Sequence, residues 1–376
     1  MQLDPGFWRG RRVLITGHAG FKGTWLRAWL AELGAQVTGF GHPPRVTPTL
    51  LELAGLEGSS LAIEGDVRDR AALAEALTAV RPEIVFHLAG QPIVLEAHRD
   101  PLGTLETNLF GTVNLLEAVR VTPGVRAVVI VTSDKCYREP HQACREADPL
   151  GGDEPYAASK ACAEIVTHAW RTTYLPPRSG NGIATARAGN VIGGGDWSAH
   201  RLVPDLVRAF AAARTPVLRR PGAIRPWQHV LDALAGYLCL ARALWADPVR
   251  FAGAWNFGPE PGGEWTVAEI AAAVSRRLGA GPWQIEAQPP VTEAPLQRLS
   301  IERAKKRLGW RPLLPTAEAV EWTVDGYRHL LETGRATWLL DQIRRYGARL
   351  GEREPRPFSA PAELELEVRH VASAPG

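Results

Sequence analysis

A phenol and an amine stand one helical turn apart in the segment Tyr156-Ala-Ala-Ser-Lys160. Side chains four positions apart lie on the same face of an α-helix, within reach of one another. A nearby ammonium stabilises a phenolate, so Lys160 is expected to lower the pKa of Tyr156 toward neutrality. A tyrosine activated in this way is a general base that takes a hydroxyl proton during hydride transfer.

A carboxyl group and a second amine follow a serine in the segment Ser133-Asp134-Lys135, directly after the apolar run 127–132. A strand over this run would place the three side chains at the carboxyl edge of a parallel sheet, where such folds bind their ligands. Burial raises the pKa of a carboxyl group and lowers that of an amine, so Asp134 is a candidate acid and Lys135 a candidate base. The alternative for this pair is an ordinary solvated loop.

A glycine-rich turn, Gly17-His18-Ala19-Gly20-Phe21-Lys22-Gly23, joins an apolar run at 12–16 to a helical pattern at 22–33. The free N–H groups and the dipole of a helix that begins at such a turn attract a phosphate group. This placement predicts dinucleotide binding, and a purely structural turn is the alternative. The cofactor contacts expected from the turn are Gly17, His18, Gly20, Phe21, Lys22 and Gly23.

The end of the second predicted strand, 36–40, is where dinucleotide-binding proteins carry an acidic residue for the adenosine ribose. The sequence there reads Gly41-His42-Pro43-Pro44-Arg45, without an acid. His42 or Arg45 would equally suit the 2′-phosphate of NADP, so NAD is the expected cofactor and NADP stays open. Asp66-Val67, after the third predicted strand, is a candidate adenine contact. A helix cap is the alternative role for Asp66.

Strand and helix patterns alternate through the first half of the chain, which predicts a doubly wound parallel sheet of the Rossmann type, an α/β fold. The predicted strands cover 12–16, 36–40, 61–63, 83–89, 127–132 and 183–187, and the predicted helices cover 22–33, 69–80, 104–120 and 156–174. We assign residues 1–190 to this dinucleotide-binding domain, with 229–255 returning to it. Pieces of 191–345 are expected to form a smaller, mixed α/β C-terminal substrate lobe, and 351–376 a loosely ordered tail.

The composition excludes several classes of protein. The 43 basic and 40 acidic residues give a net charge of +3, which argues against a nucleic-acid partner. The four cysteines form no CxxC pair, so no metal site is expected. Neither a signal peptide nor an apolar stretch of membrane-spanning length is present, which predicts a cytoplasmic protein without a membrane partner. Only five of the basic residues are lysines, and three of these are Lys22, Lys135 and Lys160.

Taken together, the glycine turn and the Tyr156–Lys160 pair resemble the extended short-chain dehydrogenase/reductase superfamily. In that family a serine or threonine after the fifth strand completes a triad with the tyrosine and the lysine, and Ser133 stands at this position. The resemblance implies a homodimer built through the helices at 104–120 and 156–174. It also implies further cofactor contacts from Leu88, Ala89, Gln91, Asn108, Tyr156 and Lys160.

Within that family, Asp134-Lys135-Cys136-Tyr137 and the segments 189–205 and 224–230 resemble the nucleotide-sugar 4,6-dehydratases that act on CDP-glucose. The resemblance implies that Tyr156 takes the proton from the sugar O4, Asp134 protonates the leaving C6 hydroxyl and Lys135 is the base at C5. Hydride would pass from C4 to the cofactor and back to C6, giving CDP-4-keto-6-deoxyglucose and water. The implied contacts to the CDP-sugar are Gln91, Asn190, Trp197, Arg201, Leu202, Arg225, His229 and Glu293.

The loop after Gln91-Pro92 departs from the family. Leu95, Ala97 and His98 stand where arginine, serine and tyrosine are usual, and Gly90 replaces an alanine. Two alternatives therefore stay open beside the dehydratase. One is a dehydratase or epimerase of the same family with another nucleotide sugar, although a simple epimerase needs no acid at C6. The other is a non-catalytic dinucleotide sensor, which needs no phenolate.

Overall fold

The computed structural model describes residues 4–43, 49–56, 61–138, 143–286 and 295–352. Its centre is a seven-stranded sheet in the order β12-β7-β5-β4-β1-β2-β3, and every neighbouring pair is parallel. The strands are β1 (Arg12–Thr16), β2 (Gln36–Gly41), β3 (Leu61–Glu64), β4 (Ile84–His87), β5 (Ala127–Val131), β7 (Gly182–Ala188) and β12 (Gly253–Phe257). The order reverses direction between β1 and β4, so the predicted doubly wound parallel fold is confirmed.

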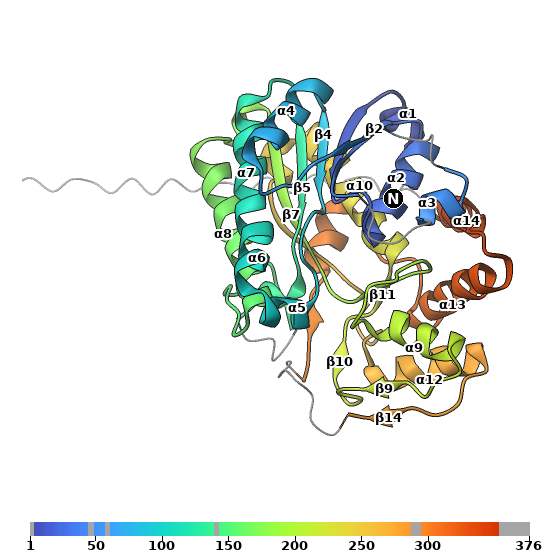
Figure 1. Cartoon of the computed structure of the whole chain (residues 1–376). Coiled ribbons are helices and arrows are strands. Elements are labelled where there is room, and N and C mark those ends of the chain that lie inside the picture. Colours follow the sequence, from blue (N-terminus) through green and yellow to red (C-terminus); the bar gives the residue numbers. More distant parts are fainter. Residues whose placement is uncertain (1–3, 44–48, 57–60, 139–142, 287–294, 353–376) are drawn as a thin grey trace, which may run out of the picture.

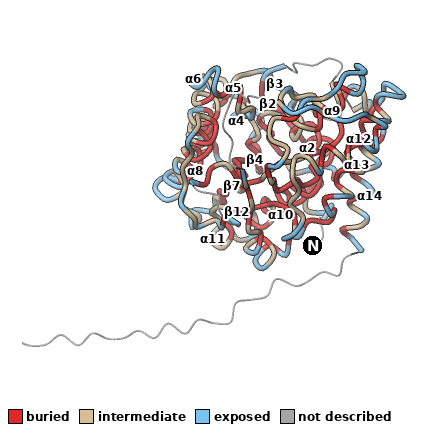
Figure 2. Tube along the Cα trace, turned by 90° about the horizontal axis from the view of Figure 1, so that it is seen from below, coloured by how far each residue is buried: buried red, intermediate tan, exposed pale blue. Residues whose placement is uncertain are grey.

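Helices cover both faces of this sheet (Figure 1). Helices α2 (Phe21–Glu32) and α10 (Val230–Ala246) pack on one face, and α4 (Arg70–Val80), α7 (Gly111–Val121) and α8 (Pro155–Thr173) lie on the other. Strand β5 has the sequence AVVIV and is buried along its whole length, because a strand covered on both faces meets apolar neighbours on each side. Figure 2 shows the buried positions as a continuous interior around β4, β7 and α10.

A smaller lobe follows β7 and lies below the sheet in Figure 1. Its elements are β8 (Val191–Ile192), α9 (Leu202–Ala211), β9 (Val217–Leu218), β10 (Ile224–Arg225), β11 (Gln228–His229), β13 (Trp265–Thr266), α12 (Val267–Leu278), β14 (Gln284–Ile285) and α13 (Thr316–Thr333). The chain returns to the sheet between these pieces to form α10 and β12. The last helix, α14 (Trp338–Glu352), packs on α2, where the Trp29 and Tyr346 rings meet edge to face at 5.5 Å.

Short elements complete the described chain. They are α1 (Pro5–Trp8), α3 (Leu50–Leu53), α5 (Val94–Arg99), α6 (Pro101–Leu105), β6 (Ala143–Cys144), α11 (Pro248–Phe251), β15 (Arg298–Leu299), three 3-10 or π turns at Asp134–Cys136, Pro177–Ser179 and Ala304–Leu308, and the π-helix Glu106–Phe110. The helix predicted over 104–120 is therefore divided by a π-helical turn. Residues 351 and 352, which we expected in the tail, belong to α14, and 353–376 lie outside the described residues.

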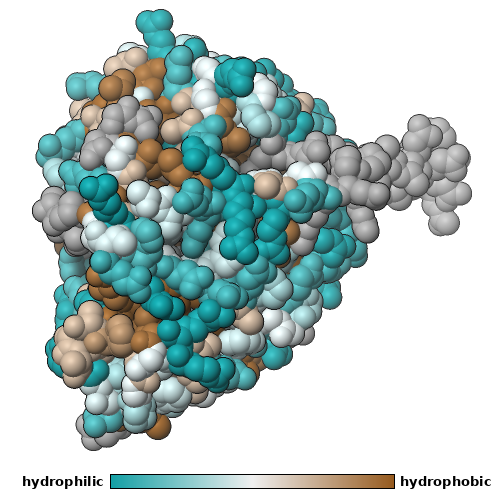
Figure 3. All heavy atoms as spheres, turned by 90° about the vertical axis from the view of Figure 1, so that its right-hand side faces the viewer, coloured by the Kyte–Doolittle hydropathy of each residue, from teal (hydrophilic) through white to brown (hydrophobic). Residues whose placement is uncertain are grey.

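The surface carries no continuous apolar belt on the face seen in Figure 3, where separate hydrophobic patches stand among hydrophilic residues. Across the described ranges, no helix combines the length and apolar character that crossing a membrane requires.

Candidate active site

A cavity of about 1390 Å³ lies at the carboxyl ends of the parallel strands, between the sheet and the smaller lobe. It is lined by the glycine turn, the ends of β4 and β5, the start of α8 and the loop that follows β7. Three predicted site residues, His18, Asn108 and His229, do not line this cavity. Glu293 lies outside the described residues. Every other predicted catalytic, cofactor or substrate residue lines it.

The glycine turn approaches neighbouring backbone closely enough to exclude side chains. Gly17 has a φ of +70°, and a Cβ there would lie 2.6 Å from the amide nitrogen of Ala89. A Cβ on Gly23 would collide with the carbonyl oxygen of Gly17. Gly20 is the N-cap of α2 and has no side chain that could cap the helix. Its first N–H groups therefore face the cavity as a phosphate cradle, which fits the diphosphate of a dinucleotide.

The side chain of His18, a predicted cofactor contact, packs against β2 and does not line the cavity. Its ring is buried and fills the space beside Gly39 of β2, where any Cβ would collide with the imidazole. Burial lowers its pKa, which favours the neutral ring. The side chain thus holds the turn against β2 and leaves cofactor contact to the backbone around it.

Asp66 lines the cavity and is held by two neighbouring basic residues. It accepts hydrogen bonds from the backbone and side chain of Arg68, at 2.9 and 2.8 Å, and lies 3.1 Å from His42. Burial by itself raises the pKa of Asp66, but these contacts with Arg68 outweigh it and hold the pKa below its ordinary value. Helix α4 is capped by Asp69, whose carboxylate accepts from two backbone N–H groups, so the alternative role of Asp66 as its cap is excluded.

Asn108 lies in the π-helical turn and acts on the loop after β4, not on the cavity. Its side chain exchanges two hydrogen bonds with the backbone of Gln91, at 2.8 and 3.0 Å, and donates a third to Ser159 Oγ at 2.9 Å. Asn108 is predicted as a cofactor contact, but every polar atom of its buried side chain already has a hydrogen-bond partner in the protein. The side chain of Gln91 is likewise bound, to Thr104 and to the N–H of Ile93.

The Tyr156 hydroxyl group lies in the cavity with a pKa opposite to the predicted direction. Burial raises the pKa of Tyr156 to about 12, although a hydrogen bond with Ser133 lowers it in part. The Lys160 ammonium points to the carbonyl oxygen of Val131, at 3.4 Å, and burial lowers the pKa of Lys160 to about 8. The expectation considered the pair alone and left out the cost of burying a phenolate.

Asp134 follows Ser133 and takes a buried position in the wall of the cavity. One carboxyl oxygen accepts a hydrogen bond from Ser133 Oγ at 3.0 Å, and the other is buried without a hydrogen-bond partner among the described residues. Burial raises the pKa of Asp134, and the positive charges of Lys135, Arg225 and Lys22 offset this only in part. A carboxyl group of this kind remains protonated to higher pH than a solvated one, which suits a general acid.

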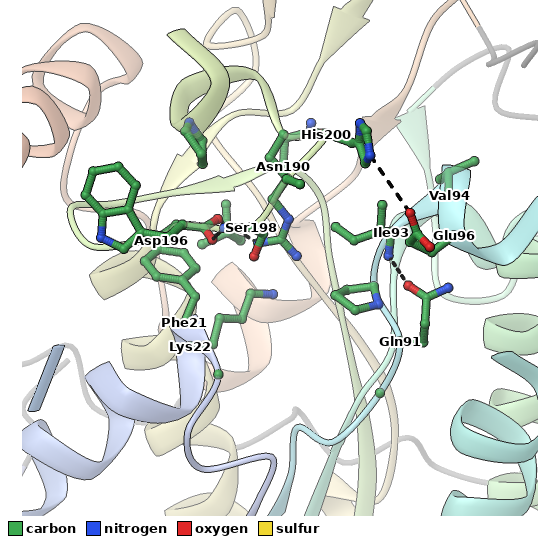
Figure 4. Close-up of a pocket in the computed structure, with 18 of the residues that line it drawn as sticks. Phe21, Lys22, Gln91, Ile93, Val94, Glu96, Asn190, Asp196, Ser198 and His200 are labelled. Carbon is green, nitrogen blue, oxygen red and sulfur yellow. Dashed lines mark hydrogen bonds and ion pairs between the residues drawn. The ribbon is translucent and has the colours of Figure 1, made fainter. Parts of the chain in front are cut away.

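Charged residues gather on the other side of the cavity, in the loop after β7. Arg201 donates to Asp196 at 2.8 Å, and the backbone carbonyl of Asp196 accepts from Tyr327. Figure 4 shows Lys22 extending from α2 toward this loop, with Asn190 above it. Burial lowers the pKa of Lys22 to about 7, so this amine also contributes a titratable group to the cavity. The sequence analysis did not identify Asp196 as a site residue, although it directly follows Gly193-Gly194-Gly195.

The mouth of the cavity is bridged by a pair that the sequence did not suggest. His200, from the loop after β7, lies 3.9 Å from Glu96 of α5, so the two sides of the opening meet there (Figure 4). The predicted contacts Trp197 and Arg225 both line the cavity. The Trp197 ring packs edge to face on Tyr327 at 5.4 Å, and Arg225 donates to the carbonyl of Ile224.

His229, a predicted substrate contact, does not line the cavity. It caps α10, where Nδ1 accepts the N–H of Leu231 at 3.3 Å. Its ring lies between Trp25 and Trp322, at 5.8 and 5.9 Å, and is fully buried. Burial lowers the pKa of His229 to about 3, so the ring stays neutral and holds the helix start against the aromatic core.

Comparison with known proteins gives a consistent result. The model of the family described as "NAD dependent epimerase/dehydratase family" matches residues 13–251. The chain is 42% identical over 317 residues to a CDP-glucose 4,6-dehydratase of Salmonella typhimurium, covering 82% of this chain and 88% of that enzyme.

Two solved structures have the same fold. A UDP-glucose 4-epimerase of Thermus thermophilus in complex with NAD has a TM-score of 0.72 at 27% identity, covering 84% of this chain and 99% of that one. A dTDP-glucose 4,6-dehydratase of Streptomyces venezuelae with NAD and TYD bound has a TM-score of 0.71 at 26% identity, covering 85% and 97%.

Proposed function

We propose that this chain, which belongs to the NAD dependent epimerase/dehydratase family, is a 4,6-dehydratase that converts CDP-glucose to CDP-4-keto-6-deoxyglucose and water. The observation that carries the proposal is the buried carboxyl group of Asp134, which lines the same cavity as Ser133, Lys135 and Tyr156. Only one of its two oxygens has a hydrogen-bond partner among the described residues. An epimerase moves hydride at C4 and needs no acid for a leaving C6 hydroxyl. A sensor needs neither group.

The residues of the glycine turn fit the cofactor, because Gly17 and Gly23 allow the close backbone packing of the turn, and the first N–H groups of α2 are left free for a diphosphate. When bound, NAD accepts a hydride from C4 of the sugar and returns it to C6. Tyr156, ionised to the phenolate, takes the O4 proton as the hydride leaves, with Ser133 hydrogen-bonded to the same oxygen. The ammonium of Lys160 supplies positive charge on the same helical face.

Asp134 and Lys135, in the turn after β5, carry out the elimination of water. Once C4 is a ketone, the C5 proton is acidic, and the amine of Lys135 removes it. Asp134 donates its proton to the C6 hydroxyl, which leaves as water. The buried environment that raises the pKa of Asp134 keeps this proton available. After hydride reaches C6, Lys135 returns a proton to C5.

The substrate side of the cavity supplies the binding groups. Arg225 and Asn190 are the proposed partners of the substrate diphosphate, since a guanidinium group binds phosphate through paired hydrogen bonds. Trp197, Arg201 and Leu202 line the adjoining wall and are proposed to enclose the cytidine.

We also propose a homodimer. Leu102, Phe110 and Ile165 are 68%, 56% and 55% exposed, and their elements α6, the π-helical turn and α8 pack side by side. Exposed apolar side chains gathered on adjacent helices are typical of a protein–protein interface. Light scattering should give the mass of two chains, and Ile165→Lys should shift the mass toward one. The four free cysteines suit the reducing environment of the cytoplasm.

The activity test uses C4-deuterated sugars. Purified protein is incubated separately with CDP-glucose, dTDP-glucose, UDP-glucose and GDP-mannose, and the products are analysed for deuterium at C6 of a 4-keto-6-deoxy sugar. Label at C6 from CDP-glucose alone supports the proposal. Inversion at C4 without loss of water would identify an epimerase, and no turnover of any sugar would refute the dehydratase. Denaturing the protein and identifying the released nucleotide decides between NAD and NADP.

A variant of Lys135 tests its role as the base. Lys135→Met keeps the length of the side chain and removes the amine. We expect turnover to fall at least about 100-fold, in the range of general acid–base effects, while the bound nucleotide is retained. Lys306→Met, on the exposed surface, is the matched control. Unchanged turnover in Lys135→Met would refute this role.

A further inference from the structure

A buried ion pair lies directly beneath the turn that carries Ser133, Asp134 and Lys135. Arg187 Nη2 contacts Glu164 Oε2 at 2.8 Å, and the two side chains are only 4% and 3% exposed. Glu164 stands on α8 one turn beyond Lys160, and Arg187 stands on β7, the strand next to β5. The role of this pair is not accounted for by the proposed chemistry.

Both ends of the turn are attached to this pair. At one end, Thr132 donates its hydroxyl hydrogen bond to the Glu164 carboxylate. At the other end, Arg187 Nη1 donates to the Tyr137 hydroxyl at 2.9 Å, and that hydroxyl donates to Asn256 Oδ1 at 2.7 Å. The segment 133–136 is thus held between two side chains that are bound to one another.

Stability alone is a weak explanation of such a pair. Two charges lose their hydration when buried, and apolar replacements of similar size are often as stable or more stable. Although burial by itself lowers the pKa of Arg187, the Glu164 carboxylate raises it above its ordinary value, so the guanidinium keeps its charge. A charged pair fixes direction as well as distance, because its hydrogen bonds require one geometry.

Resting on the proposed function, we infer that Glu164 and Arg187 are positioning residues that form a bracket, attached through Thr132 and Tyr137, which holds Asp134 and Lys135 at the sugar ring. Misplacement of a reacting group by about 1 Å can reduce a rate 100-fold. Loosening one attachment should therefore slow the reaction without weakening substrate binding to the same degree.

The chain offers a matched pair of threonines for the test. Thr132 and Thr185 are both buried and both donate a hydroxyl hydrogen bond to Glu164. Thr185 lies within β7, and among the described residues its side chain makes no hydrogen bond to the turn. Valine replaces threonine with almost the same shape and removes only the hydroxyl group. The comparison of Thr132→Val with Thr185→Val separates positioning of the turn from general stabilisation of Glu164.

We expect Thr132→Val to lower kcat about tenfold or more with KM within about threefold of wild type. Thr185→Val should lose similar thermal stability and keep kcat within about twofold. Thr132→Ser, which restores the hydroxyl group, should recover most of the lost kcat. Equal kcat values for Thr132→Val and Thr185→Val would overturn the inference, because a structural role predicts equal effects.

A second measurement does not depend on the substrate. Hydrogen exchange of the 133–137 amides, read by mass spectrometry on the full chain, should be faster in Thr132→Val than in Thr185→Val and wild type. If wild-type protein fails to dehydrate CDP-glucose but amide exchange is still faster in Thr132→Val, the proposed function is refuted. The result would still support the bracket, because the turn depends on Thr132. If exchange is the same in all three proteins, the bracket is refuted whatever the substrate. The double variant Glu164→Leu/Arg187→Met, which leaves no unpaired charge, should fold and also show the faster exchange.

Discussion

Ser133 Oγ donates a hydrogen bond of 3.0 Å to one carboxyl oxygen of Asp134, and the second oxygen is buried with no hydrogen-bond partner among the described residues. Ionising a carboxyl group that has one buried oxygen without a hydrogen-bond donor costs free energy, because nothing stabilises the charge on that oxygen. The neutral acid needs fewer partners. This relationship explains why burial raises the pKa of Asp134 despite three nearby cations.

Asp134→Asn should separate the two halves of the reaction. The amide keeps the shape of the side chain but has no acidic proton, so we expect turnover to fall at least about 100-fold. Oxidation at C4 should persist, and reduced nucleotide should accumulate on the protein, visible by its absorbance. In wild type, kcat should fall as the pH rises through the raised pKa of Asp134. The exposed Asp153→Asn serves as the control, and full turnover in Asp134→Asn would exclude this acid.

The phenol of Tyr156 should titrate differently with and without cofactor. In nucleotide-free protein, burial raises its pKa to about 12. Oxidised NAD carries a positive charge on its nicotinamide ring, and a positive charge nearby favours the phenolate. The pKa measured from tyrosinate absorbance should therefore be lower in the NAD-loaded protein. Tyr156→Phe should remove this titration step, and a value independent of NAD would contradict the assignment of Tyr156 as base.

Lys160 should make folding stability depend on pH in a defined window. Burial lowers its pKa from 10.5 to about 8, so between these values the unfolded chain binds more protons than the folded one, and stability rises with pH. Nucleotide-free Lys160→Met should therefore be more stable than wild type near neutral pH, by up to about 3 kcal/mol. This difference should shrink as the pH approaches 10.5. Chemical denaturation at several pH values measures it, and a difference that widens with pH would refute the argument.

Gly90→Ala should damage the site although alanine is a small change. A Cβ at this position would lie 2.9 Å from Asn108 Oδ1 and 3.2 Å from Lys160 Nζ. Asn108 is fixed by three hydrogen bonds, so Lys160 or the loop must move. We expect kcat to fall about tenfold or more, as for other small misplacements, with a lower Tm. Gly347→Ala, where a Cβ meets nothing within 4 Å, should keep wild-type kcat. Equal kcat in both variants would contradict a packed site.

The sequence by itself determined the features that depend on local order along the chain. Alternating strand and helix patterns predicted the parallel sheet, because hydrophobic periodicity reports secondary structure directly. The turn Gly17 to Gly23 and the spacing of Tyr156 and Lys160 are also local patterns. They identified a cofactor turn and a catalytic pair, and both line the cavity. Predicting the order of elements was enough to bring Ser133, Asp134 and Tyr156 to one edge.

Only the tertiary structure decided what surrounds each side chain. His18 and His229 are polar residues in site-like motifs, yet the fold turns both into the interior. The pKa of Tyr156 is raised, although the sequence predicted that Lys160 would lower it. Desolvation depends on all the atoms packed around the phenol, and these come from several parts of the chain. Likewise, Glu164 and Arg187 come from a helix and a strand, and no local pattern reveals that their side chains meet beneath the catalytic turn.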